Sequence, residues 1–270
     1  MRIAIAGATG FLGGSLARAL SAHEVVPLPR GAIGSSQVDA LVWAAGSRDV
    51  ESLAGHAVHV VDPVAAIAAL RPRRVIYLSS GEVYGDAPLP FCEHGEVRAA
   101  TPYARAKLAG EAAVDDAARA LGATAIALRL SVVYGPGQRP AMLIPQLVRA
   151  LEAGEPIALT SGEQTRDFLH IDDASRAIAL AIAMPAPPRT LNLGSGRETR
   201  VRDVCLELAR LFDRDPSLLR FGTRHPRTAE SPRYALDISL AGRVLGWQPK
   251  VSLAHGLAEL RPSHLLRVGP

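Results

Sequence analysis

The sequence contains little cysteine, little lysine and no long hydrophobic run, and each of these absences narrows the possible functions. Cys92 and Cys205 lie in unrelated segments, so neither a disulfide framework nor a metal site is supported. No segment approaches the roughly 18 consecutive apolar residues of a membrane span. Lysine occurs only at Lys107 and Lys250, although the chain has 30 basic residues, so a lysine at a candidate functional position carries weight.

The charge balance gives no indication of a nucleic-acid partner. The 30 basic and 26 acidic residues leave a net charge of +4, and no basic block accompanies it. Hydrophobic residues make up 48% of the 270 residues, which excludes a disordered or fibrous chain. The apolar stretch after Arg2 is compatible with a secretory signal, but regularly spaced glycines and Arg18 favour a nucleotide-binding loop. We therefore expect a cytoplasmic protein without membrane contacts.

Short apolar segments alternate with helical patterns through the first half of the chain. This alternation predicts an α/β domain over residues 1–135, built on a doubly wound parallel sheet. Residues 31–38 alone separate Arg30 from the strand that begins near Asp39, too few for the usual helix and further strand, so one strand and one helix are expected to be missing. Strands are predicted at residues 2–6, 24–28, 39–45, 75–79 and 125–130, and helices at 11–20, 57–70 and 102–120.

The composition changes after Tyr134, where prolines and arginines become denser. We interpret residues 136–260 as a smaller substrate-binding lobe and residues 261–270 as a tail. The return of later helical segments to the first domain is left open. Short strands are predicted in the second lobe at 157–159, 167–171 and 190–193, with helices at 141–153, 173–184 and 201–212.

A glycine-rich loop directly follows the first strand and opens a helix. Gly7 permits a tight turn, Gly10 lets the backbone approach a pyrophosphate, and Gly13 lets the helix pack on the strand. A purely structural glycine turn is the alternative. The pattern predicts a dinucleotide site, to which we assign Gly7, Thr9, Gly10, Phe11, Leu12, Gly13, Ala44 and Ala45.

The end of the second strand indicates which dinucleotide is bound. An NAD site places an acidic residue there, about 20 residues beyond the glycine loop, where it binds the ribose hydroxyls. The segment Val26-Pro-Leu-Pro-Arg30 has no acid, and the guanidinium of Arg30 matches the 2′-phosphate of NADP. A solvent-exposed arginine is the alternative interpretation. We therefore favour NADP as the cofactor and keep NAD as the alternative.

Three polar residues form a candidate catalytic group. Tyr103 and Lys107 are four residues apart on a predicted helix and therefore lie on one face of it. A nearby ammonium stabilises a phenolate and lowers its pKa from about 10 toward the working range of a general acid or base. Ser80 follows the strand 75–79 at the carboxyl edge of the sheet, where its hydroxyl is placed to bind a substrate oxygen. A surface packing pair is the structural alternative for Tyr103 and Lys107.

With these motifs in place, the sequence resembles the extended short-chain dehydrogenases/reductases, specifically the NAD-dependent epimerase/dehydratase family that modifies nucleotide-linked sugars. The resemblance covers roughly residues 1–260 and implies a Rossmann-like fold. It rests on the order and spacing of the glycine loop, Ser79-Ser-Gly-Glu-Val-Tyr-Gly85, Tyr103 with Lys107, Tyr134-Gly-Pro-Gly137, Gly162-Glu-Gln-Thr-Arg-Asp-Phe-Leu-His170 and Asn192-Leu-Gly-Ser-Gly196.

The resemblance also implies a role for each matching residue. Tyr103 would be the acid/base, Lys107 would hold the nicotinamide ribose, and Ser80 would bond the reacting oxygen. Arg166 and Arg227 match arginines that bind the substrate diphosphate, although a surface arginine is the alternative for each. Relatives pair through helices equivalent to 57–70 and 102–120, so a homodimer is expected.

Three departures from the family pattern bear on the reaction. Val132 replaces an asparagine that helps hold the diphosphate, and either His59-Val60 or His56-Ala57 stands where an Asn-Val pair usually begins the helix before the Ser80 strand. Dehydratases of the family carry an Asp-Glu pair after the serine or threonine, whereas here Gly81 precedes Glu82. Without that aspartate, water elimination by the usual route is not expected. Glu82 either assists proton transfer at the substrate or fixes its own loop by hydrogen bonds.

Four functions are compatible with these observations. The first is an NADPH-dependent reductase of a nucleotide-linked ketosugar, and the runner-up is an NAD-retaining nucleotide-sugar C4 epimerase that uses the same residues. A reductase of carbonyls without a nucleotide is the third, because Val132 weakens the diphosphate argument. A non-catalytic dinucleotide-binding sensor is the fourth, and the intact pair of Tyr103 and Lys107 argues against it.

Overall fold

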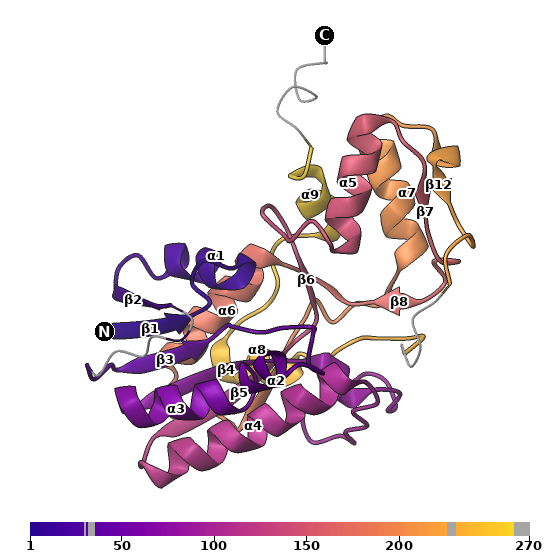
Figure 1. The fold of residues 1–270 in the computed structure, drawn as a ribbon. Helices are drawn as coiled ribbons and strands as arrows, with labels where there is room; N and C mark the ends of the chain where they lie inside the picture. Colours follow the sequence, from indigo (N-terminus) through magenta and orange to yellow (C-terminus); the bar gives the residue numbers. More distant parts are fainter. Residues whose placement is uncertain (30, 32–35, 226–230, 262–270) are drawn as a thin grey trace.

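A six-stranded parallel sheet forms the centre of the molecule (Figure 1). The computed structural model describes residues 1–29, 31, 36–225 and 231–261. All neighbouring strands run parallel, in the order β10-β5-β4-β3-β1-β2, which confirms the predicted α/β sheet. Their bounds are β1 Arg2–Ala6, β2 Glu24–Leu28, β3 Ala40–Trp43, β4 Arg74–Ser80, β5 Thr124–Leu130 and β10 Thr190–Leu193.

Helices cover both faces of the sheet (Figure 1). α3 and α4 pack together on one face, and α1 and α6 pack together on the other. Because both faces are covered, the central strands are mostly buried, and β3 is apolar and buried at every position. The helices associated with this sheet are α1 Phe11–Ala19, α2 Leu53–Ala57, α3 Val61–Leu70, α4 Pro102–Ala120, α6 Ile171–Ala183 and α8 Ser239–Leu245.

The connection between β2 and β3 is as short as the sequence predicts. Between Leu28 and Ala40, the described residues contain neither a helix nor a strand. β2 is consequently the edge strand of the sheet, and β3 pairs with the other side of β1. Arg30, the residue expected to select NADP, lies outside the described residues.

Later segments of the chain return to this sheet. β10 pairs with β5, and α6 packs on α1. The strand 190–193, which the sequence analysis assigned to the second lobe, therefore belongs to the main sheet. The alternation of apolar residues identified the strand correctly, but it carries no information about the partner strand. Trp247 is fully buried in the core on the face that holds α1 and α6.

The remaining elements form a second region beside the carboxyl ends of the sheet strands (Figure 1). Its core is apolar and centres on α5 and α7, where Leu147, Leu151 and Leu208 are fully buried. Three two-stranded sheets pair β6 with β9, β7 with β12 and β8 with β11. The bounds are β6 Val132–Tyr134, α5 Leu143–Ala153, β7 Ile157–Ala158, β8 Thr165–Arg166, β9 Phe168–His170, β11 Thr199–Arg200, α7 Val201–Leu211, β12 Leu219–Arg220 and α9 Leu253–Ala258, with the short 3₁₀ helix η2 Pro216–Leu218. A second 3₁₀ helix, η1 Gly81–Tyr84, directly follows β4 and packs on α4.

Two predicted elements are shorter in the structure. Of the helix predicted at 57–70, Ala57 ends α2 and Val61 begins α3, because Val60 leaves the helical conformation with φ −121°. Of the strand predicted at 167–171, residues 168–170 form β9, since Asp167 lies between β8 and β9 and Ile171 begins α6. The buried carboxylate of Asp167 accepts backbone hydrogen bonds from Ser195, Gly196 and Leu236. Over the described ranges, no helix combines the length and the apolar character needed to cross a membrane.

Candidate active site

A cavity of about 740 Å³ lies where the carboxyl ends of the sheet strands meet the second region. Gly7 and Thr9 lie in the glycine loop but do not line the cavity wall, and Arg30 and Arg227 fall outside the described residues. Eleven residues assigned from the sequence line it together: Gly10, Phe11, Leu12, Gly13, Ala44, Ala45, Ser80, Glu82, Tyr103, Lys107 and Arg166. The volume falls in the range of small-molecule and cofactor sites.

The glycine loop has the geometry that a pyrophosphate requires. Gly7 has φ +80°, and a Cβ there would lie 2.9 Å from the backbone nitrogen of Ala45. A Cβ on Gly13 would lie 2.1 Å from the carbonyl oxygen of Gly7, so only glycine lets α1 pack this closely on β1. Gly10 caps α1 without a side-chain hydrogen bond, and the first turn has no acidic residue. The amides at this helix start are therefore available to an anion, and the loop fits a dinucleotide phosphate.

Ser80 occupies the last position of β4 and also caps η1. Its Oγ accepts a hydrogen bond of 3.2 Å from the backbone N–H of Glu82. The strand end and the cap together fix the hydroxyl at the carboxyl edge of the sheet, on the wall of the cavity. The oxygen retains one lone pair and its proton for another partner.

Tyr103 and Lys107 lie on the first turns of α4. Thr101 caps this helix by accepting from the N–H of Ala104 at 3.0 Å, and Pro102 takes the first helical position, as the sequence predicts. The Nζ atom of Lys107 lies 5.8 Å from the centre of the Tyr103 ring. This ammonium donates to the carbonyl oxygen of Leu78 at 2.7 Å, which ties α4 to β4 next to Ser80.

The ionisation of Tyr103 differs from the expectation drawn from the sequence. We expected the ammonium of Lys107 to lower the pKa of the phenol, but burial raises the pKa of Tyr103 to about 12. Lys107 itself is only 4% exposed, and burial lowers its pKa to about 7. At both residues, desolvation of the charged form outweighs the favourable charges nearby, which are Arg48 and Arg139 for Tyr103 and Glu111 for Lys107. The protein alone therefore keeps Tyr103 in its protonated, acidic form at neutral pH.

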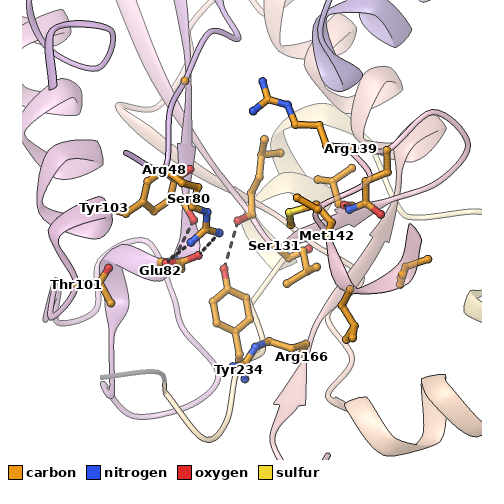
Figure 2. A pocket seen from close by; sticks show the side chains of 18 of the residues that line it. Arg48, Ser80, Glu82, Thr101, Tyr103, Ser131, Arg139, Met142, Arg166 and Tyr234 are labelled. Atoms are coloured by element: carbon orange, nitrogen blue, oxygen red, sulfur yellow. Dashed lines mark hydrogen bonds and ion pairs between the residues drawn. The ribbon is translucent and has the colours of Figure 1, made fainter. Parts of the chain in front are cut away.

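The cavity also contains residues that the sequence analysis did not select. Arg48 and Tyr234 lie beside Ser80 and Glu82, and Arg139 lies on the other side of the space (Figure 2). A weak signal existed for Arg48, because it follows the predicted strand 39–45 at the edge of the sheet where ligands bind. Tyr234 belongs to an irregular segment, and no pattern in the sequence pointed to it.

His59 lies in the protein interior and contacts the ring of Tyr103. It is fully buried, and its ring makes an edge contact with Tyr103 at 5.7 Å between centroids. Its Nε2 atom lies 2.8 Å from the carbonyl oxygen of Ser47, in the loop after β3. Burial and the charge of Lys107 lower the pKa of His59 to about 4, so the imidazole is neutral at neutral pH.

A buried ion pair holds the layers beneath the cavity together. Arg129 on β5 donates to both carboxylate oxygens of Glu111 on α4, at 3.1 and 2.8 Å. The side chains are 6% and 8% exposed, and Ser79 on β4 donates a third hydrogen bond to the same carboxylate. The arrangement joins α4 to β4 and β5 directly below Ser80 and Lys107. Its role is to fix the relative positions of the candidate catalytic residues.

Arg166 reaches the cavity from β8 of the second region. Its guanidinium donates to the backbone carbonyl oxygens of Thr165 and Ser231, the latter at 3.0 Å. These bonds hold the guanidinium on the wall of the cavity, where a positive charge attracts an anion.

Comparisons with known proteins agree with this architecture. Residues 35–194 match the model of the NAD dependent epimerase/dehydratase family. The UDP-glucose 4-epimerase of Mycolicibacterium smegmatis is 34% identical over 75% of this chain, and dTDP-glucose 4,6-dehydratase 1 of Escherichia coli is 30% identical over 68%. The chain spans 66% and 56% of the lengths of these two relatives.

Solved structures extend the similarity to nearly the whole chain. MoeE5 in complex with UDP-glucuronic acid and NAD superimposes with a TM-score of 0.85 and 30% identity, covering 96% of this chain and 97% of that one. A double mutant of DesIV, a dTDP-glucose 4,6-dehydratase from Streptomyces venezuelae with NAD bound, gives a TM-score of 0.87 at 25% identity, over 96% and 95% of the two chains. The chain therefore belongs to the NAD-dependent epimerase/dehydratase family.

Proposed function

We propose that the protein is an NAD(P)-dependent oxidoreductase that acts on a nucleotide-linked sugar, with Tyr103 as the acid/base. The observation that carries the proposal is the meeting of Ser80, Tyr103 and Lys107 with the glycine loop in one cavity. A bound nicotinamide dinucleotide supplies or accepts the hydride. The remaining requirements are a proton donor or acceptor, a hydrogen bond to the reacting oxygen and a fixed geometry.

The residues of the chain meet these requirements in a simple way. When a sugar carbonyl is reduced, its carbon gains the hydride and its oxygen gains the proton of the Tyr103 hydroxyl. The hydroxyl of Ser80 donates a hydrogen bond to the same oxygen and stabilises the negative charge that develops there. Oxidation of a sugar hydroxyl is the reverse, so the Tyr103 phenolate accepts the proton. Lys107 positions α4 against β4 through the carbonyl oxygen of Leu78.

Dehydration is disfavoured by the structure around Gly81. Water elimination in the family uses an aspartate at this position, and glycine provides no side chain. A Cβ at position 81 would lie only 2.1 Å from the hydroxyl oxygen of Tyr234, so the space for that side chain is already filled. We therefore restrict the proposal to hydride transfer, even though several relatives are named as dehydratases.

Two reactions remain as candidates, and different observations favour them. A reductase that consumes NADPH follows from the absence of an acid after β2 and from Arg30. A C4 epimerase that retains NAD is favoured by the relative at 34% identity, named as UDP-glucose 4-epimerase, and by the NAD in the MoeE5 complexes at 30% and 29% identity. Both reactions use Ser80 and Tyr103 in the same way.

The experiment that separates them begins with the bound cofactor. Freshly purified protein is denatured, any released dinucleotide is identified, and the emptied protein is titrated with NADPH and NADH. Retained NAD⁺ supports the epimerase and removes the proposed role of Arg30. An empty site that prefers NADPH by about tenfold or more supports the reductase. If the protein binds neither NADPH nor NADH and releases no dinucleotide, the proposed oxidoreductase function is wrong.

Arg166 provides the test of the nucleotide part of the substrate. We propose that its guanidinium, placed on the cavity wall, binds the diphosphate. R166Q is expected to raise KM for nucleotide-linked sugars by about tenfold or more and to leave dinucleotide binding unchanged. An equal rise in KM for a simple carbonyl compound that lacks a nucleotide would indicate that the natural substrate also lacks a nucleotide.

A further inference from the structure

Arg48 lies across the ring of the candidate catalytic tyrosine. Its guanidinium carbon is 4.3 Å from the centre of the Tyr103 ring, well within the range of a cation–π contact. Arg48 comes from the loop after β3, whereas Tyr103 begins α4, so the contact joins two separate elements (Figure 2). The positive charge lies against the phenol itself, on the wall of the cavity.

The same guanidinium is held by the carboxylate of Glu82. The two Nη atoms of Arg48 lie 2.6 and 3.3 Å from the two carboxylate oxygens, which is a two-point ion pair. Glu82 is the second residue of η1 and donates its backbone N–H to Ser80. The positive charge of Arg48 and the negative charge of Glu82 therefore both lie near the phenol of Tyr103. Glu82 is also hydrogen-bonded to Ser80 through its backbone N–H.

Lys107 by itself supplies only part of the positive charge that would stabilise a phenolate at Tyr103. Its ammonium is directed to the carbonyl oxygen of Leu78, and its pKa of about 7 means that the charge is present only in part at neutral pH. The guanidinium of an arginine remains charged at every pH at which proteins fold. Arg48 is therefore the cation beside Tyr103 whose charge does not depend on pH.

Several groups face Tyr103 from the elements around it. The charges of Arg48 and Arg139 lower the pKa of the phenol, and the charge of Glu82 raises it, against the larger effect of burial. Among the residues that the structure describes, the titratable or charged neighbours are Arg48 from the loop after β3, His59 before α3, Tyr77 on β4, Glu82 on η1, Lys107 on α4 and Arg139 after β6.

We propose that Arg48 is the permanent positive charge that stabilises the phenolate of Tyr103, and that Glu82 limits this stabilisation by pairing with Arg48. The inference rests on the proposed function, in which Tyr103 moves a proton. Arg48 and Glu82 are positioning residues in this account, because they act on the substrate through Tyr103. When Glu82 holds the guanidinium, Tyr103 is favoured as an acid, and when the carboxylate is removed, it is favoured as a base.

A simple structural role for the ion pair predicts a different outcome. If the pair only fastened the loop after β3 to η1, removing either partner would loosen the same contact. R48Q and E82Q would then shift the pKa of the Tyr103 phenol in the same direction. The electrostatic account requires opposite directions, because one substitution removes a positive charge and the other a negative charge.

The test is an ultraviolet titration of phenol ionisation on the intact protein. Burial raises the pKa of all 5 tyrosines, Tyr77, Tyr84, Tyr103, Tyr134 and Tyr234, so the signal of Tyr103 is assigned by difference. Y103F identifies it as the transition that this substitution removes. Circular dichroism at each pH confirms that the variants remain folded.

We expect R48Q to raise the midpoint of the Tyr103 transition by about one pH unit and E82Q to lower it by a similar amount. R48K keeps a positive charge and should retain more than about half of the stabilisation. R105Q is the matched control, because Arg105 is exposed on α4 two residues away, and its removal should shift the midpoint by less than about 0.2. No shift in R48Q, or shifts of R48Q and E82Q in the same direction, would overturn the inference.

A kinetic measurement extends the test to the reaction. The rate of sugar oxidation rises with pH as Tyr103 ionises, so R48Q should move this rise to higher pH and E82Q to lower pH. The titration needs no substrate and therefore tests Arg48 separately from the function. Absence of any turnover by the unmodified protein with nucleotide sugars would overturn the proposed function while leaving the titration result in place.

Discussion

The hydroxyl oxygen of Tyr234 occupies the space directly beside Gly81, where any other residue would place its first side-chain atom. The separation from an ideal Cβ at position 81 would be 2.1 Å, far below van der Waals contact. Tyr234 is held there because its hydroxyl donates to the carbonyl oxygen of Leu130 at 3.2 Å. Gly81 and Tyr234 therefore constrain each other, and the constraint lies next to Ser80.

This relationship predicts the effect of a minimal substitution. G81A should destabilise the protein by about 2 kcal/mol, because the added methyl group overlaps Tyr234 and forces the packed wall to move. Adding Y234F removes the overlapping oxygen and should recover part of the loss. Urea denaturation of the single and double variants measures both effects.

A second glycine provides the control for G81A. Gly242 lies in α8, and a Cβ there would meet only the carbonyl oxygen of Trp247 at 3.7 Å, an ordinary contact. G242A should therefore be neutral or stabilising by up to about 1 kcal/mol. If G81A were as stable as the unmodified protein, the explanation for the missing dehydratase acid would be wrong.

The buried pair of Glu111 and Arg129 should be costly to break from one side. E111Q leaves the guanidinium of Arg129 buried without its counter-ion, so we expect a loss of about 3 to 5 kcal/mol in the free energy of unfolding. The exposed pair of Glu207 and Arg210 is the comparison, and E207Q should cost less than about 1 kcal/mol. Denaturant titrations of both variants would contradict this account if the two losses were equal.

Lys107 should make stability depend on pH. Burial lowers its pKa from 10.5 to about 7 in the folded protein. Between these two values the unfolded chain binds a proton that the folded protein does not bind, so stability rises as pH increases through this window. Below about pH 7 the folded protein carries the full cost of a buried ammonium.

K107M removes this cost and therefore should stabilise the protein by roughly 2 to 4 kcal/mol at about pH 6, with a smaller gain at about pH 10. Thermal unfolding of the two proteins at both pH values measures the difference. K250M is the matched control, because Lys250 is exposed and is the only other lysine. An equal gain from K107M at both pH values would show that the charge of Lys107 is not its cause.

The local features of the fold could be predicted from the sequence. Apolar runs located β1 and β2 with the observed bounds, and the spacing of Thr101 and Pro102 located the start of α4. The short connection after β2 follows from chain length alone. These features depend on neighbouring residues, and periodicity, capping and glycine spacing report such interactions directly.

Contacts between distant residues could not be predicted in this way. Arg48 and Tyr103 are separated by 55 positions, and Gly81 and Tyr234 by 153, with no motif that links either pair. The raised pKa of Tyr103 was also missed, because spacing on a helix reveals a neighbouring charge and does not reveal burial. The partner of β10 was missed for the same reason, since strand patterns do not encode pairing.

The central claim is that Tyr103 moves the proton that accompanies hydride transfer. The most direct measurement is the rate of nicotinamide oxidation or reduction when the dinucleotide-loaded protein is mixed with a nucleotide sugar, compared between the unmodified protein and Y103F. We predict that Y103F binds the dinucleotide within about threefold of the original affinity and transfers hydride at least about a hundredfold more slowly. Hydride transfer by Y103F at an undiminished rate would contradict the account.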